Sequence, residues 1–529
     1  MIAKATFLNA CVCQKLGWLQ HRKQVEAVPS LAEKLRMTEG REVHDKARSL
    51  LPDGLTPSSS EGTAAAEATA SLIGRSSTKS VYEATFVSDP FVARADMLVR
   101  AQGAWNVLEV KSSTNEKPEL TDDLAYTVMV CEKAGLPVNR ATLLLVSKDY
   151  RLGMPDEKLF TEVDATTAVH SRVAEFGAVA DGVAESVLGD RMPEAQPSYA
   201  CKDCPLIEEC VTKGIPDPIF NVPRLGAPKC KELISRGILK IADIPSGFPL
   251  SDSQRRVVDC IRSGRRYVGT GLAARLAAIR WPAYYLDFET MKPVIPLYSD
   301  TAPHTQVPTQ YSIHKCDKPG NVVQHLDYLA DPRRDCRREL AERLLDDLAE
   351  RGSIVAYSTF EKTTIDGLAK LDSCKDLAAR LENLKARIFD LHDVIRLELC
   401  DPLFHGRTSI KVTLPALVPE MSYAGLAIAE GDTALATFTL MARGDLTGQP
   451  AEEAKVNLRE YCKRDTLAMV KLHEHLAQCV CQRPLAREPE LVLCREYRGR
   501  LTGLRHVSVL IVPRPCQRSR SFHQHHSRL

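Results

Sequence analysis

The sequence predicts a mixed α/β protein of two or three domains, and three stretches of the 529-residue chain support that prediction. From Trp281 onward, strand-like and helix-like segments alternate, as they do in α/β domains. Between residues 92 and 111, two strand-like runs are joined by a turn, which predicts a hairpin. Near residue 200, three cysteines follow the spacing C-x2-C-x5-C, which indicates a metal or cluster site.

Composition and charge are those of an ordinary globular protein. The 70 basic and 68 acidic residues leave a net charge of +2, which does not by itself indicate nucleic-acid binding. No apolar run approaches the length of a membrane span, and the apolar stretch before Cys11 is too short for a signal peptide. The 17 cysteines form no small-scaffold pattern, so we expect a reducing, cytoplasmic location and no membrane partner.

In the first third of the chain, a helix is expected over residues 29–50, followed by a stretch that is partly loop. The hairpin comes next, with Asp96 in its first strand and Glu109 and Lys111 on one face of its second. Asp96 and Glu109 could hold a divalent metal, while Lys111 could position water and stabilise charge on a phosphate. The alternative is an amphipathic hairpin with a surface Glu/Lys pair.

The cysteine motif requires a further ligand. Cys201, Cys204 and Cys210 make three, whereas structural zinc sites and iron–sulfur clusters usually take four. Cys13 is the preferred fourth ligand and Cys11 the alternative, so that a metal would join the two ends of the domain. A structural zinc knuckle is the competing interpretation.

Residues 216–280 are interpreted as a helical connector. Within it, residues 225–238 predict a short helix, a glycine turn and another short helix. Such helix–hairpin segments can contact phosphate backbones through turn amides, although a plain helical linker is the simpler interpretation.

The stretch Tyr284–Thr290 predicts a strand that ends in two carboxylates. Asp287 and Glu289 would project to the same face, where their mutual repulsion favours a bound cation such as Mg²⁺ or Mn²⁺. Tyr461 and Asp465 stand four apart in a helical segment and could face the same ion. The alternatives are a chance Asp-x-Glu on a solvated edge and a core aromatic at Tyr461.

Residues 1–215 resemble the PD-(D/E)XK nucleases of the RecB-like type that carry an iron–sulfur staple, including CRISPR-associated four-cysteine exonucleases. The residues that match that family's motifs in order are Cys13, His44, Asp96, Glu109, Lys111, Cys201, Cys204 and Cys210. The resemblance implies a four-iron four-sulfur cluster and a role for His44 at the metal. The chain departs from the family in the next helix, where the usual Gln and Tyr are absent and Asp123 leads to Thr127.

Residues 281–475 resemble the DEDD exonucleases of the RNase H-like fold. The nearest resemblance is to an uncharacterised bacterial domain family often found behind such a four-cysteine nuclease, with a Gly-x-x-Ser-x-Lys segment that here ends at Lys411. The resemblance implies that Asp287, Glu289 and Asp465 hold two metal ions about 4 Å apart, and that Tyr461 orients the attacking water. For the second acidic position it offers Glu361, with Asp390 as the alternative or as a helix N-cap.

The predicted domains are therefore a PD-(D/E)XK nuclease-like domain at 1–215, a connector at 216–280, an RNase H-like domain at 281–478 and a basic tail at 479–529. The expected function is metal-dependent hydrolysis of nucleic acid, DNA in preference to RNA, with 3′-to-5′ exonuclease chemistry in the C-terminal domain and a possible place in DNA repair. The alternative is a nucleic-acid-binding or scaffolding protein with degenerate sites, stabilised by zinc rather than by a cluster.

Overall fold

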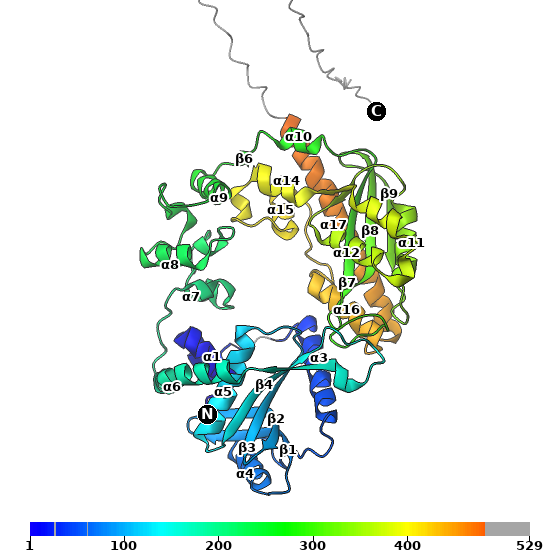
Figure 1. Ribbon diagram of the computed structural model, residues 1–529. Helices are drawn as coiled ribbons and strands as arrows, with labels where there is room; N and C mark the ends of the chain where they lie inside the picture. Colours follow the sequence, from blue (N-terminus) through cyan, green and yellow to red (C-terminus); the bar gives the residue numbers. More distant parts are fainter. Residues whose placement is uncertain (26–27, 61, 482–529) are drawn as a thin grey trace, which may run out of the picture. The chain divides into compact units, whose positions relative to one another are not determined.

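Two five-stranded sheets lie in separate stretches of the chain, the first in residues 80–164 and the second in residues 283–390 (Figure 1). The computed structural model describes residues 1–25, 28–60 and 62–481. The basic tail predicted from residue 479 lies, from residue 482 on, outside the described residues. The last described helix runs to Cys481, three residues past the predicted end of the RNase H-like domain at 478.

The chain begins with four helices. The third starts at a capping box in which the Ser30 hydroxyl accepts from the Glu33 backbone N–H and the Glu33 carboxylate accepts from the Ser30 N–H. This agrees with the helix predicted over 29–50, and the partly loop-like stretch after it contains a further helix. The bounds are α1 Lys4–Val12, α2 Gln14–His21, α3 Leu31–Ser49 and α4 Gly62–Ile73.

The first sheet has the order β1-β2-β3-β4-β5, with β3 and β4 parallel and the other neighbours antiparallel. The predicted hairpin is present as β2 and β3, and both turn residues, Gln102 and Gly103, have positive φ. Because β3 and β4 are parallel, a crossover helix, α5, connects them. The bounds are β1 Ser80–Ser88, β2 Phe91–Ala101, β3 Ala104–Lys111, α5 Pro118–Lys133, β4 Val138–Val146, β5 Phe160–Asp164 and α6 Thr166–Leu188.

The connector has its own small core, which includes Ile219, Leu233, Ile241 and Val258. The predicted first helix of its helix–hairpin segment is α8. The residue Gly237 then turns with a φ of 72°, but the predicted second helix is only a three-residue 3₁₀ turn, Ile241–Asp243. The bounds are α7 Ile207–Cys210, α8 Ala227–Ser235, α9 Asp252–Ser263, β6 Tyr267–Val268 and α10 Leu272–Leu276.

The second sheet has the order β11-β10-β7-β8-β9. Strand β7 is central, parallel to β10 and antiparallel to β8, which explains its uninterrupted apolar run before Asp287. The bounds are β7 Ala283–Met291, β8 Val307–Lys318, β9 Asn321–Leu329, β10 Ile354–Ala356 and β11 Ile388–Asp390, with β12 Leu399–Cys400 paired to β6.

Seven helices in the described residues accompany the second sheet, and the long helix α17, drawn in orange, packs against β7 and β8 (Figure 1). Buried residues from β7, β8 and α17 belong to the same core. The bounds are α11 Arg337–Asp347, α12 Phe360–Ala369, α13 Ala378–Lys385, α14 Leu391–Glu398, α15 Ile410–Leu417, α16 Gly431–Arg443 and α17 Gly448–Cys481. Within the described ranges, none of the helices is long and apolar enough to cross a membrane.

Candidate functional site

Strand β7 and helix α17 bring three carboxylates together. Asp287 and Glu289 leave β7 on the same face, and Asp465 comes from the side of α17 that packs against that strand. One carboxylate oxygen from each of the three lies within 4.8 Å of the others. These are the three residues that the sequence assigned to one metal centre, and the ion itself stays a prediction.

A cavity of about 450 Å³ surrounds this group. Glu361, in the first turn of α12, lines the cavity and is 3% exposed. The Ser358 hydroxyl donates to its carboxylate at 3.3 Å. Asp390 instead caps α14 and accepts from the Asp393 backbone N–H at 3.2 Å. The geometry therefore favours Glu361 over Asp390 as the fourth carboxylate of the site.

The carboxylates of this cavity hold protons more tightly than usual. Burial, together with the charges of Asp465 and Glu289, raises the pKa of Asp287 well above its ordinary value. Burial raises the pKa of Glu361 to about 7, and it raises that of Asp465 to about 6 against the opposing effect of a hydrogen bond from Tyr423. A bound cation would relieve this repulsion, since it competes with protons for the same oxygens.

Two tyrosines and a lysine complete the cavity region. Tyr461 lines the cavity and hydrogen-bonds to Asp465, and the Tyr423 hydroxyl also donates to Asp465. Lys411 lines the same cavity, with its ammonium 5.8 Å from the ring centres of both tyrosines. Lys411 ends the Gly-x-x-Ser-x-Lys segment, and the sequence alone assigns it no role.

Sequence reasoning missed Tyr423 and His392. Tyr423 lies in a loop without periodicity, so no pattern could have linked it to Asp465. His392 follows the cap residue of α14 and lines the cavity, with its Nε2 2.8 Å from the Thr408 hydroxyl. A histidine in the segment where a predicted strand enters a helix was the available signal.

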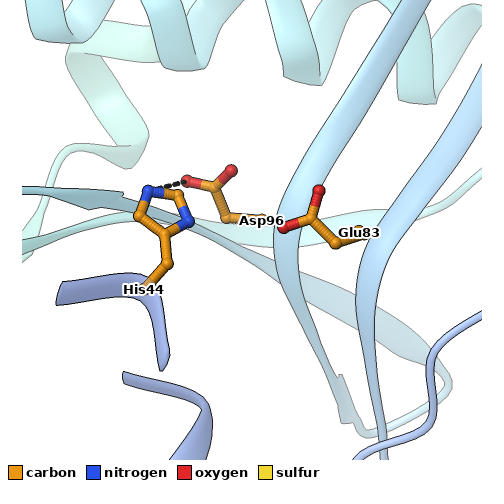
Figure 2. Close-up of side chains that lie close together, drawn as sticks. All are labelled: His44, Glu83 and Asp96. Atoms are coloured by element: carbon orange, nitrogen blue, oxygen red, sulfur yellow. Dashed lines mark ion pairs between the residues drawn. The ribbon is translucent and has the colours of Figure 1, made fainter. Parts of the chain in front are cut away.

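Helix α3 and the first sheet carry a second group of donors, formed by His44 of α3, Glu83 of β1 and Asp96 of β2 (Figure 2). One donor atom from each lies within 4.8 Å of the others, and His44 Nε2 is 4.0 Å from Asp96 Oδ2. The other partner of Asp96 is the backbone N–H of Val110, which donates to its carboxylate at 2.8 Å. His44 and Asp96 therefore lie close together, and the role of His44 at a metal stays a prediction.

Glu83 was not foreseen from the sequence. Its backbone φ is 52°, in the left-handed region that a glutamate in a strand rarely adopts. This interrupts the pairing of β1 and β2 between Tyr82↔Met97 and Ala84↔Ala95, opposite Asp96. Arg48 and Arg94 form ion pairs with the Glu83 carboxylate. Nothing in the residue pattern signals such a conformation.

Glu109 lies beside this group but is held by lysines. It is 1% exposed, with Lys4 Nζ at 2.5 Å and Lys111 Nζ at 3.0 Å from its Oε1. Its Oε2 is buried and has no hydrogen-bond partner among the described residues. Burial raises the pKa of Glu109, but Lys4 and Lys111 outweigh that effect and bring it below its ordinary value. The expected metal pair of Asp96 and Glu109 thus stays a prediction, with Glu83 as an added donor.

The departure in helix α5 has a visible consequence. Lys111 Nζ also contacts Asp123 at 2.5 Å, so a carboxylate of α5 is paired with this lysine. Tyr126 is fully buried, and its hydroxyl donates to the Ile2 carbonyl at 2.7 Å. It is therefore a core residue that holds the N-terminus against the sheet.

All four predicted cluster cysteines line one cavity of about 340 Å³; they are Cys13, Cys201, Cys204 and Cys210. Burial and the charges of the other three thiols raise the pKa of Cys204. Cys11 lines a different cavity, beside Arg172 and Phe176, which favours Cys13 as the fourth ligand.

Comparison with known proteins adds two similarities. Residues 284–409 match a domain of unknown function (DUF2779), a stretch that includes Asp287, Glu289 and Glu361 and ends before Lys411 and Asp465. The chain is also 26% identical over 207 residues to an uncharacterized protein of Mycoplasma pneumoniae (strain ATCC 29342 / M129), the MG366 homolog. That match covers 36% of this chain and 31% of the relative's length, well under two thirds of the relative.

Proposed function

We propose that this protein is a metal-dependent nuclease whose C-terminal centre hydrolyses phosphodiester bonds, in DNA rather than RNA and from the 3′ end. The observation that carries the proposal is the convergence of Asp287, Glu289 and Asp465 to within 4.8 Å in a cavity that also holds Glu361. Oxygen donors of this kind suit Mg²⁺ or Mn²⁺. When bound, such ions acidify water and neutralise charge on a phosphate.

The charge balance of the cavity supports a cation site. Its lining has four carboxylates and one lysine, which gives a formal charge of −3 when all are ionised (1 − 4 = −3). A buried site with that charge is costly unless the carboxylates take up protons or share cations. The residues present therefore fit the divalent ions that the resemblance implies.

Tyr461 is the residue proposed to orient the attacking water. Its ring lines the cavity, and its hydroxyl is hydrogen-bonded to Asp465, so it is anchored at one of the carboxylates. A hydroxyl held in this way can accept or donate one more hydrogen bond to a water in the cavity. The 3′-to-5′ direction and the preference for DNA rest on the resemblance to DEDD exonucleases.

The first sheet is proposed as a second hydrolytic centre, with His44, Glu83 and Asp96 as donors and Lys111 beside them. One observation favours a competing role for it. Lys4 and Lys111 both engage Glu109, and Asp123 engages Lys111, so these charges are already paired. A domain with this arrangement could bind nucleic acid without cutting it.

The four-cysteine cavity is proposed to hold a four-iron four-sulfur cluster. Four cysteines line a common cavity, and four is the number of thiolate ligands that such a cluster usually takes. The cluster would connect the junction of α1 and α2 to the segment around α7, and so fix the two ends of the first domain together.

The test compares single-site variants of the full chain purified without oxygen. End-labelled single-stranded DNA, double-stranded DNA and RNA are incubated with Mn²⁺ and wild type, Asp287→Asn or Asp96→Asn, with exposed Asp317→Asn as the matched control. We expect Asp287→Asn to lose about 10³-fold or more of the 3′-end degradation, because it removes a metal ligand. The control should keep wild-type rates.

The outcomes separate the hypotheses. If only Asp96→Asn lost the ability to degrade the labelled nucleic acid, the activity would belong to the first centre. Wild type that binds DNA but releases no nucleotides with any divalent ion would contradict the nuclease proposal and support the binding role. EDTA must abolish the reaction in every active protein.

A further inference from the structure

Lys411 is the only lysine or arginine that lines the carboxylate cavity within the described part of the chain. It lies in the first turn of α15, and its side chain is 32% exposed. Its ammonium donates to the Ala429 carbonyl at 2.8 Å and to the Glu430 carboxylate at 2.5 Å. An ammonium has three N–H groups, so one more donor is available for a ligand in the cavity.

The position of this ammonium relates it to the reacting centre. It lies 5.8 Å from the ring centres of Tyr423 and Tyr461, and both hydroxyls hydrogen-bond to Asp465. Lys411 is therefore separated from the proposed metal ligand Asp465 by two tyrosine side chains, and its one ion pair among the described residues is with Glu430.

A purely structural role explains this arrangement poorly. The side chain of Glu430 is 69% exposed, and ion pairs with such solvent-exposed carboxylates contribute little to stability. A lysine that only joined α15 to the loop before α16 could do so from the protein surface. Instead, the ammonium stands at a cavity lined by four carboxylates, where a compact cation can contact an anionic group that enters.

We propose that Lys411 is a catalytic residue of the C-terminal centre, whose ammonium contacts a nonbridging oxygen of the scissile phosphate. The inference rests on the proposed nuclease function. In the reaction, the oxygen of water forms the new P–O bond, the P–O3′ bond breaks, and the leaving O3′ takes a proton that water supplies. Lys411 contributes charge and position and transfers no proton.

The contact has a measurable signature apart from turnover. A lysine on a phosphate adds affinity that is independent of base sequence and falls with salt, because each neutralised phosphate releases counterions. Removing it should reduce the salt dependence of binding by about one unit of log–log slope. A lysine that only tethers a loop would leave that slope unchanged.

The experiment uses the full chain and a fluorescein-labelled oligo-dT with a free 3′ end. Binding is measured by anisotropy in Ca²⁺ at several NaCl concentrations, and turnover is measured in Mn²⁺. The variants are Lys411→Met, which keeps the methylene stem, Lys411→Arg, Glu430→Gln, and Lys471→Ala as the control. Lys471 is also paired with a glutamate, Glu474 at 2.8 Å, but it does not line the cavity.

We expect Lys411→Met to lower kcat by about 10²-fold, as removal of one transition-state donor does, and to weaken binding with a smaller salt slope. Lys411→Arg should recover part of both losses. Glu430→Gln should tighten binding, because the ammonium is then shared with one fewer anion. If Lys411→Met and Glu430→Gln weakened DNA binding equally, Lys411 would act only through its ion pair with Glu430, and the proposal would be wrong. Unchanged binding and kcat in Lys411→Met would also overturn it.

Asp287→Asn, measured in parallel, distinguishes the two possible failures. If Asp287→Asn loses activity while Lys411→Met behaves as wild type, the Lys411 proposal alone is wrong. If wild type neither binds nor degrades the oligonucleotide, the nuclease proposal fails and the Lys411 contact fails with it. Thermal unfolding of each variant shows whether a loss of binding or activity comes from the site or from a destabilised fold. If Lys411→Met is destabilised, the comparison of Lys411→Arg with wild type tests the proposal instead.

Discussion

Glu361 and Asp390 show how the surroundings of a carboxylate decide its role. Asp390 is the last residue of the short parallel strand β11, Glu361 follows the short parallel strand β10, and both are acidic residues near the start of a helix. The Asp390 carboxylate accepts from a backbone N–H of its own helix, which is the usual work of an N-cap. Glu361 lines the carboxylate cavity, and burial raises its pKa to about 7.

This difference predicts unequal effects of two amide substitutions. Glu361→Gln should lower Mn²⁺-dependent DNA degradation by about 100-fold or more, since even residues that only support metal ligands are worth 10–100-fold. Asp390→Asn should keep nearly full activity, and because Asn is also a good N-cap its stability should change by less than about 0.5 kcal/mol. Gel assays of end-labelled DNA and thermal unfolding measure both effects, and a severe loss in Asp390→Asn alone would reverse the assignment.

At the scale of elements, helix α1 places a lysine against the first sheet. Lys4 reaches Glu109 at the end of β3, 105 residues away in sequence, and shares it with Lys111. A buried carboxylate held by two ammonium groups is favourable only while both remain, because an unpaired buried charge is costly. The N-terminal helix therefore takes part in the electrostatics of the candidate centre.

The direction of the Glu109 pKa shift predicts how the loss of stability in Lys4→Met depends on pH. The folded-state pKa of Glu109 lies below its ordinary value of 4.5, so its ion pairs stabilise the fold above that pH and are lost as pH falls. Lys4→Met should therefore lower the free energy of unfolding by about 1–3 kcal/mol at pH 7, and by progressively less as the pH falls below 4.5 toward the folded-state pKa of Glu109. Urea-unfolding midpoints at pH 7 and at a series of pH values below 4.5 measure this, with exposed Lys34→Met as the control. A loss that stays the same throughout the series would argue against the electrostatic cause.

At the scale of the whole molecule, the four cysteines join segments almost 200 residues apart. Cys13 stands between α1 and α2, Cys201 lies within η2, Tyr199–Asp203, Cys204 directly follows η2, and Cys210 is the last residue of α7. A cofactor bound by all four would close a long loop of chain, which is where a crosslink limits the unfolded state most. Its loss should therefore weaken the first domain as a unit.

A pair of serine substitutions tests the ligand set. Cys13→Ser should reduce the iron content and the visible absorbance of anaerobically purified protein and lower its unfolding temperature by several degrees, because each removed ligand weakens the cluster. Cys11→Ser, in the neighbouring cavity, should match wild type in all three measurements. Stoichiometric zinc in a colourless wild-type protein would contradict the cluster. Loss of iron only in Cys11→Ser would make Cys11, and not Cys13, the fourth ligand.

The spacing of residues along the chain was enough to predict several strands, helices and turns, and which side chains of one element share a face. The period of two put Asp287 and Glu289 on one face, and likewise Glu109 and Lys111, while the period of a helix put Tyr461 one turn from Asp465. The turn at Gln102-Gly103 marks where the chain reverses between β2 and β3, and the capping box at Ser30 marks the start of α3. These features depend on neighbours in the chain, so the residue order expresses them directly.

Only the tertiary structure decided which side chains of different elements meet. The left-handed backbone of Glu83, the reach of Lys4 to Glu109 and the hydrogen bond from Tyr423 to Asp465 involve no sequence period. They arise because packing of sheets and helices brings distant segments within a few ångströms, and burial then makes each charge depend on its new neighbours. The sequence by itself determined which strands carry carboxylates and which of those carboxylates share a face. The packed structure decided which side chains of other elements contact them.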